Sequence, residues 1–207
     1  MAKQLTPHSR VEQAKARNDA ILAAALVEFV ANGFAATRID DVAKRAGVAK
    51  GTVFHHFTDK ERLFESMARA VLQPWVDRID QLVPAPDMLI RSVIEAFLTP
   101  LVEEIATPRG DVLRLFISEG MRFPRLADFY HGEILSKLFG RLRPLLRIAA
   151  ARGELCNPGI AELPQLIGAP IVVGVLWHGL FQRIEPLDHS ALLKVQLDCL
   201  FVGKDRG

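Results

Sequence analysis

Residues Ile39 to Phe57, "IDDVAKRAGVAKGTVFHHF", form the stretch that decides the fold. Its apolar residues recur at helical rather than strand spacing, and Gly47 divides it into two short helices joined by a tight turn. The first helix places Asp40 and Asp41 early and its basic residues late, as the helix dipole favours. The second helix, which begins near Lys50, does the opposite.

The start of this second helix lacks the features that normally stabilise a helix. Ala49 cannot cap it, Lys50 adds positive charge to a positive helix end, and Gly51 costs up to about 1 kcal/mol relative to alanine. Such violations are expected where function overrides folding preference. A nucleic-acid phosphate would resolve this one, because Gly51 and Thr52 allow close approach to Lys50 and to the free N–H groups. An ordinary surface helix is the alternative.

Helical spacing continues along the whole chain, and no sustained alternation predicts a strand. An earlier helix should end at Asn32-Gly33, and the capping-box-like Thr37–Asp40 should start the helix that contains Asp41. After the helix at Lys50, Thr58–Glu61 should open another helix, which Pro74 kinks or ends. Further helices are expected over 87–106, 107–120, 124–152, 161–183 and 188–202. The predicted fold is all-α. A helix-turn-helix domain with an N-terminal arm is assigned to residues 1–72, and a larger helical domain to residues 73–207.

The composition is that of a globular protein, with 50% hydrophobic and 24% charged residues among 207 and a net charge of +2. Attraction to nucleic acid must therefore come from a local patch. Ten basic and seven acidic residues lie between Met1 and Arg62, which is a modest excess that a solvated surface would explain equally well. The sequence predicts a globular protein whose charge alone does not identify a partner.

Residues 21–64, "ILAAALVEFVANGFAATRIDDVAKRAGVAKGTVFHHFTDKERLF", resemble the DNA-binding domain of the tetracycline-repressor (TetR) family of bacterial transcription regulators. The correspondence runs without gaps from the phenylalanine-rich end of the first helix to Lys60-Glu61. Outside this stretch the chain agrees with the family only in length and helical pattern. The resemblance implies a ligand-responsive regulator, a repressor that binds a palindromic double-stranded DNA operator as a dimer and is released by a small, largely apolar effector.

The resemblance also implies roles for residues of the N-terminal domain. Thr37, Arg38 and Lys60 would contact phosphates. The residues expected on or beside the major-groove face are Lys50, Gly51, Thr52, Phe54, His55 and His56. Val42, Ala43, Val48, Val53 and Phe57 would be the core that fixes the angle between the two short helices. The family often has serine or threonine where Ala49 stands and tyrosine where Phe54 stands, so two phosphate contacts would be missing here.

The larger domain contains enough aromatic and apolar residues to line a cavity. The candidate lining residues are Phe97, Leu101, Phe116, Met121, Phe123, Tyr130, Trp177 and Phe181, with Glu119, Arg122 and His178 as polar groups that could orient a ligand. Packing of an ordinary helical core is the alternative for each of them. The family resemblance implies that an unidentified small-molecule effector binds in this domain and changes the distance between the two DNA-binding domains of a dimer.

The last two expected helices are apolar over a broad surface. Their apolar residues include Ile167, Ile171, Val172, Val175, Leu176 and Leu180, then Leu192, Leu193, Val195, Leu197, Leu200 and Phe201. Such helices either complete the monomer's core or meet a second copy. The family pattern, a four-helix bundle from both subunits, implies a homodimer through these two helices.

The chain shows no pattern of a membrane protein. Leu166–Leu180 is too short and too interrupted to span a bilayer, and the N-terminus lacks the apolar core of a signal peptide. Cys156 and Cys199 form no CxxC pair and are expected as buried or half-buried thiols of a reducing compartment. We expect a cytoplasmic protein without membrane contact.

Catalytic and metal-binding motifs are also missing from the sequence. There is no GxSxG, no glycine-rich phosphate loop and no HExxH. His55 and His56 are neighbours on a helix and point about 100° apart, so they cannot chelate one ion. We expect no catalytic site, no metal and no cofactor. Two alternatives to a regulator are a hydrophobe-binding helical protein with an incidental helix-turn-helix, and a helical enzyme that uses His131 or His178 as a base.

Overall fold

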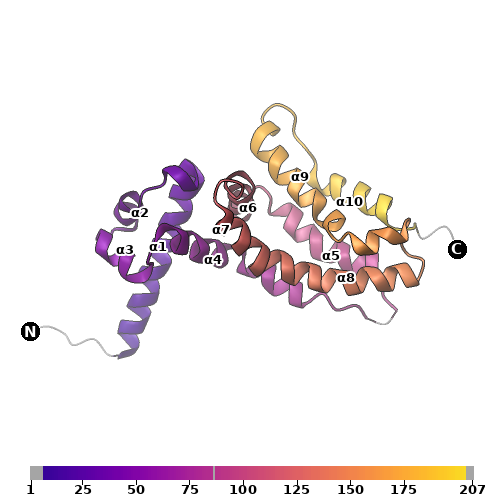
Figure 1. The fold of residues 1–207 in the computed structure, drawn as a ribbon, viewed down its shortest axis with the longest axis horizontal. Coiled ribbons are helices and arrows are strands. Elements are labelled where there is room, and N and C mark those ends of the chain that lie inside the picture. The colour runs from indigo at the N-terminus through magenta and orange to yellow at the C-terminus, as the bar shows by residue number, and fades with distance from the viewer. Residues whose placement is uncertain (1–6, 86, 204–207) are drawn as a thin grey trace, which may run out of the picture.

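The computed structural model describes residues 7–85 and 87–203, and every extended regular element in this part of the chain is a helix (Figure 1). The first four are α1 (Pro7–Ala36), α2 (Ile39–Ala46), α3 (Lys50–His56) and α4 (Lys60–Asp80). The others are α5 (Ile90–Glu103), α6 (Pro108–Glu119), α7 (Pro124–Tyr130), the π-helix η1 (His131–Leu135), α8 (Ser136–Ala151), the 3₁₀-helix η2 (Pro158–Glu162), α9 (Gln165–Phe181) and α10 (His189–Leu200). The predicted all-α fold is confirmed.

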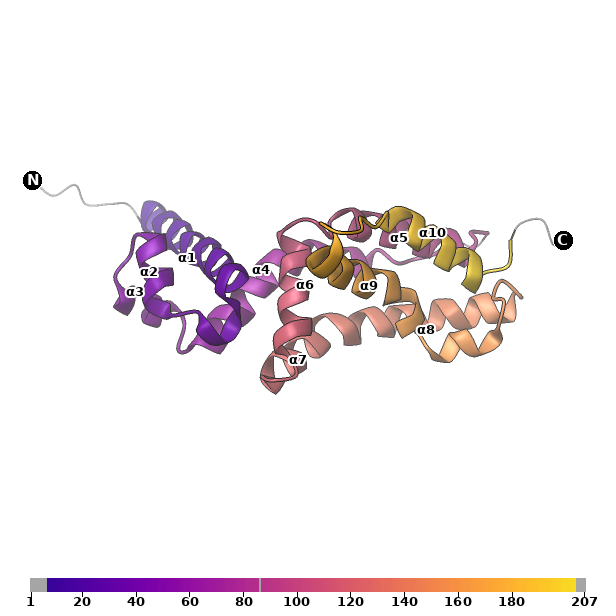
Figure 2. The same ribbon diagram turned by 90° about the horizontal axis from the view of Figure 1, so that it is seen from above.

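The molecule is elongated, with α1–α3 at one end and the helices from α5 onward at the other (Figure 1, Figure 2). α4 connects the two ends and continues through Pro74 to Asp80, so this proline does not end the helix. The boundary predicted between residues 72 and 73 falls inside α4, and it remains a prediction. α6 lies beside α1 and α4 where the two parts meet.

α1 ends through a glycine, as the Asn-Gly pair predicts. Gly33 has φ 74° and ψ 171°, which interrupts the helix before a final turn to Ala36. The positive φ disfavours a side chain there, and a Cβ would lie 2.6 Å from Oε1 of Glu119, which would have to move. The α1 terminus is therefore shaped by a residue from the larger domain.

The predicted capping box of α2 is wrong. Arg38 occupies the N-cap without a side-chain hydrogen bond. The Thr37 hydroxyl instead donates to the carbonyls of Gly33, at 2.7 Å, and Glu28, at 3.1 Å, because Thr37 is packed against the end of α1. At α4 the cap is Asp59, whose Oδ1 accepts from the N–H of Arg62 at 2.7 Å.

The two parts share one aromatic core. Phe29 and Phe34 of α1, Phe64 of α4 and Phe116 of α6 pack with ring centroids 5.1–5.8 Å apart in successive contacts. Edge-to-face aromatic pairs of this kind contribute about 0.5–1.5 kcal/mol beyond their burial. The phenylalanine-rich end of α1 therefore anchors the N-terminal helices on α4 and α6.

The long or broken helix expected over 124–152 is a broken one, divided by the π-helical turn η1. Two other expectations about the larger domain need correction. The helix expected from residue 161 begins only at Gln165, after η2. Cys156 and Cys199 are exposed rather than buried. By length and composition alone, Val11–Ala36 of α1 could cross a membrane, and one third of its most apolar window is buried inside the protein.

Candidate nucleic-acid interface and inner cavity

α2 and α3 are held at a fixed angle by a small buried core. Val42 and Ala43 of α2, Val53 of α3 and the following Phe57 are buried. Gly47 adopts the left-handed conformation, at φ 68°, and the N–H of Val48 returns to the carbonyl of Ala43 at 3.0 Å. This tight turn gives the second helix of a helix-turn-helix a defined direction.

The outward face of α3 is the surface predicted to enter the major groove. Lys50, Gly51, Phe54 and His55 are exposed, and Thr52 and His56 are half-buried. Phe54 keeps 45% of its surface accessible, which is unusual for a phenylalanine in a small domain. One face of a single short helix thus presents a cation, a bare backbone, an aromatic ring and an imidazole.

Lys50 is not an uncompensated charge in the free protein. Its Nζ lies 2.9 Å from Oδ1 of Asp40 on α2 and donates a hydrogen bond to Oδ2 at 3.1 Å, and this hydrogen bond holds the pKa of the Asp40 carboxyl below its ordinary value. Ala49 contributes no side-chain cap to α3, as predicted. Asp40 therefore already supplies an anion beside Lys50 in the free protein, and a phosphate at the start of α3 stays a prediction. A phosphate would have to compete with this carboxylate.

The three residues predicted to contact phosphates lie in different surroundings. Thr37 is only 3% exposed, so its side chain cannot reach a phosphate. Arg38 is exposed, with its Nη2 3.8 Å from Asp40. Lys60 donates from Nζ to the carbonyls of Ala35, at 3.0 Å, and Thr37, at 3.2 Å. We therefore keep Arg38 as a candidate contact and interpret Lys60 chiefly as a clamp on the α1–α2 connection.

The larger domain encloses an apolar cavity of about 240 Å³, which we call the inner cavity. α4, α5, α6, the α7–α8 segment and α9 each contribute lining residues. These are Trp75, Ile79, Phe97, Leu101, Leu113, Ile117, Tyr130, Ile134, Leu135, Leu138, Phe139, Gln165, Gly168, Ile171, Val172 and Val175. Burial raises the pKa of Tyr130 to about 12, so its phenol stays protonated and can donate a hydrogen bond at neutral pH.

Only Phe97, Leu101 and Tyr130 of the predicted pocket residues line this cavity. Phe116 lies behind Tyr130 at 4.8 Å between ring centroids, and Glu119, Arg122 and Phe123 face the end of α1 or the surface near it. Met121 is 88% exposed. Trp177 packs on Phe181, and His178 packs near His189.

The sequence missed most of the cavity wall. Most of the missed residues are aliphatic side chains from α4, α6, the α7–α8 segment and α9, and such residues look like ordinary core in the sequence. Trp75, which follows Pro74 in α4, is the residue whose type could have indicated a cavity wall in the sequence. Among the described residues there is no cluster of three or more potential metal ligands.

The structure combines a helix-turn-helix, whose second helix is exposed, with a helical domain around an apolar cavity. This combination is typical of a DNA-binding regulator. The family model "Bacterial regulatory proteins, tetR family" matches residues 21–67, and "Tetracyclin repressor-like, C-terminal domain" matches residues 90–194. The chain belongs to the TetR family of transcriptional regulators. Proteins of this family are DNA-binding regulators rather than enzymes.

Curated relatives and solved structures agree with this assignment. The chain is 26% identical over 188 residues to the HTH-type transcriptional regulator SrpR of Pseudomonas putida, covering 89% of this chain and 84% of SrpR. It is 37% identical over 134 residues to RutR of Escherichia coli O157:H7, covering 63% and 61%. The fold is similar to that of the fatty acid degradation regulator FadR from Bacillus halodurans, at 21% identity and a TM-score of 0.68 over 98% and 99% of the two chains.

Proposed function

We propose that this protein represses transcription by binding a palindromic double-stranded DNA operator as a homodimer, and that a small, largely apolar effector releases it. The observation that supports DNA reading by α3 is its outward face, where Lys50, Gly51, Phe54 and His55 are exposed on a helix fixed by a buried core. Arg38 lies exposed at the start of α2, where it adds a cation for the DNA backbone.

Dimerisation is supported by the outer face of α9. Ile167, Ile171 and Val175 face the monomer's own core and are buried. The opposite side of the same helix leaves Val172, Val173, Leu176, Leu180 and Phe181 exposed, and Val195 is exposed on the neighbouring α10. Large contiguous apolar patches on a protein surface mark interaction sites. A second copy related by a two-fold axis would cover this face and present two α3 helices to a palindrome.

Effector control is supported by the position of the inner cavity. Its walls include Leu113 and Ile117 of α6, and the same helix contacts α1 through Glu119. A ligand that binds better to one placement of α6 would shift the protein toward that placement. The apolar walls and the Tyr130 hydroxyl suit a mainly apolar molecule with one hydrogen-bond acceptor.

The test is to find a DNA fragment that the protein protects, beginning with the DNA beside its own gene, and to titrate that fragment by fluorescence anisotropy at several salt concentrations. Lys50→Ala should weaken binding and lower the slope of log affinity against log salt by about 0.9, since one phosphate contact is lost. Lys137→Ala on α8, far from α3, is the matched control and should match wild type. Equal salt slopes for both variants, or no protected fragment, would contradict DNA reading by α3.

Transcription from a reporter that contains the fragment should rise when the protein is removed; a fall would indicate an activator.

A further inference from the structure

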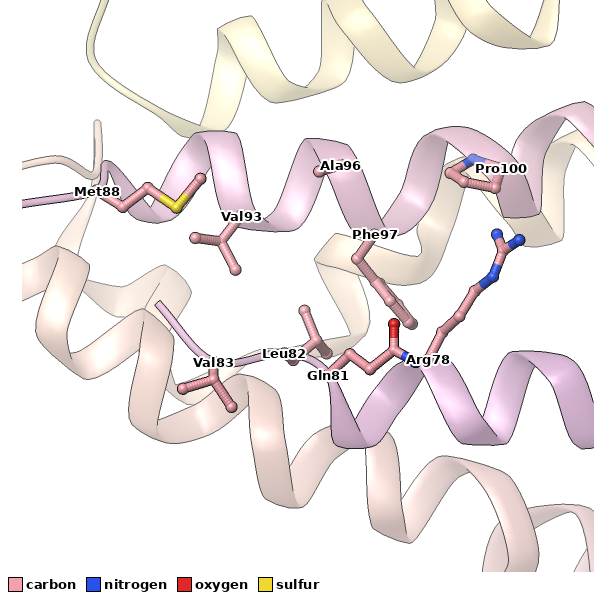
Figure 3. A pocket seen from close by; sticks show the side chains of 9 residues that line it. All are labelled: Arg78, Gln81, Leu82, Val83, Met88, Val93, Ala96, Phe97 and Pro100. Carbon is pink, nitrogen blue, oxygen red and sulfur yellow. The ribbon is translucent and has the colours of Figure 1, made fainter. Parts of the chain in front are cut away.

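A second cavity, of about 460 Å³, lies between the last turn of α4 and the length of α5 (Figure 3). It is lined by Arg78, Gln81, Leu82, Val83, Met88, Val93, Ala96, Phe97 and Pro100. Phe97 also lines the inner cavity and is the one residue that the two linings share, so we treat this second space, the outer cavity, as a distinct site. Its volume is within the range of small-molecule sites, about 300–1,000 Å³.

Arg78 is the one charged residue of the outer cavity wall. Its Nη1 is shielded from solvent and has no hydrogen-bond partner in residues 7–85 and 87–203. Figure 3 shows the guanidinium extending from α4 toward Pro100 of α5, at one end of the cavity. Burying a guanidinium nitrogen without a hydrogen-bond partner costs free energy. Such a nitrogen is found where a ligand or another group accepts its hydrogen bond.

The neighbouring acids do not neutralise Arg78. On the same helix, Asp77 accepts a hydrogen bond from Gln73 at 2.7 Å, and Asp80 is paired with Arg141 at 3.2 Å. Across the gap, Glu104 is paired with Arg109 at 3.0 Å. These carboxylates therefore do not balance the positive charge of Arg78, which lines the cavity.

The end of the cavity away from Arg78 is apolar. Figure 3 shows Met88, Val83 and Val93 at this end, with Leu82 and Phe97 between them and the guanidinium. A ligand that matches this wall has an anionic group at one end and a hydrocarbon chain at the other. Arginine binds carboxylates through two parallel hydrogen bonds, which makes a carboxylate the anion of best fit.

We propose that the outer cavity binds an amphipathic organic carboxylate, with the carboxylate on the Arg78 guanidinium and its hydrocarbon chain toward Met88 and Val83. The Gln81 amide beside Arg78 supplies a further donor for the carboxylate. Binding at this site does not depend on the proposed repressor function; only its role as an effector site would rest on that function.

The test is calorimetric titration of the full-length protein, without DNA, with sodium octanoate, octanamide and inorganic phosphate. Octanoate should bind wild type at least about ten-fold more tightly than octanamide, because the charge-assisted hydrogen bonds are lost with the amide. Arg78→Gln should weaken octanoate binding at least about ten-fold. Arg143→Gln, an exposed arginine on α8 outside this cavity, is the matched control and should leave octanoate binding unchanged.

A second variant keeps the test decisive if Arg78→Gln does not fold. Ala96 is exposed on the cavity wall, so Ala96→Phe should fill the space without disturbing the core and should abolish octanoate binding. Octanoate binding that survives either substitution at wild-type affinity overturns the proposal. So does octanamide or phosphate binding as tightly as octanoate. Because DNA is absent, neither result depends on whether the protein acts as a repressor.

Discussion

Glu119 of α6 accepts a hydrogen bond from the backbone N–H of Phe34, 3.2 Å away, and so joins the helical domain of the inner cavity to the end of α1. Its other oxygen, Oε2, is shielded from solvent without a partner in the described part of the chain. Two residues before Glu119 in the sequence, Ile117 lines the inner cavity. A displacement of α6 by a ligand would therefore act directly on the residue that follows Gly33 and precedes the helix-turn-helix.

The Glu119–Phe34 contact should contribute to stability and to communication between the two domains. We expect Glu119→Ala to lower the free energy of unfolding by about 1 kcal/mol, since a partly buried hydrogen bond is lost. The measurement is urea unfolding. Glu119→Gln is the control, because its amide oxygen can still accept from Phe34, and it should lose less. Equal losses in both variants would show that the charge of Glu119, rather than this hydrogen bond, matters.

The Lys50–Asp40 pair should be visible in a titration. Its hydrogen bond lowers the folded-state pKa of Asp40 below 3.8, so the stabilisation is present above 3.8 and is lost as the pH falls through the lowered value. We expect the NMR titration midpoint of the Asp40 carboxyl to lie below 3.8 in wild type and to return toward 3.8 in Lys50→Gln. Lys137→Gln should leave it unchanged. A midpoint that does not respond to Lys50→Gln would mean that the pair does not persist in solution.

The inner cavity can be filled from Gly168, where an added Cβ meets no atom within 4 Å. Gly168→Leu should raise the free energy of unfolding by about 1 kcal/mol, because leucine favours the helix over glycine, and should reduce binding of a neutral apolar dye such as N-phenyl-1-naphthylamine. Gly140→Leu on α8 is matched, since a Cβ there is equally unhindered and Gly140 does not line the cavity. It should stabilise the helix similarly without reducing dye binding. Undiminished dye binding by Gly168→Leu would place the dye elsewhere.

The exposed face of α9 should control oligomeric state. Leu180 is 65% exposed in the single chain, so Leu180→Glu should leave the fold intact. We expect it to produce monomers at micromolar concentration in sedimentation equilibrium, where the proposal predicts a dimer for wild type. Met121→Glu introduces the same charge at an exposed apolar residue outside this face. It should remain a dimer. A dimeric Leu180→Glu protein would show that the contact between subunits lies on another surface.

Local sequence signals predicted the parts of the fold that depend on neighbouring residues. Gly33 and Gly47 interrupt or end helices where a positive φ is needed, and Pro108 follows the Thr107 cap at the start of α6. The same reasoning failed for Thr37, because its hydroxyl bonds back to the end of α1 instead of capping α2. A capping motif has more than one available partner, and the packing of α1 against α2 decides between them.

The sequence by itself determined that this chain is all-helical, that it contains a helix-turn-helix around Gly47, and that it belongs with DNA-binding regulators, because those properties depend on residue periodicity and on a short contiguous motif. Only the tertiary structure decided which side chains line the inner cavity, that Asp40 compensates Lys50, and that Arg78 lines the outer cavity with an Nη1 that has no hydrogen-bond partner among the described residues. Those relationships join residues from separate helices. Their geometry depends on how the helices pack, which no local pattern specifies.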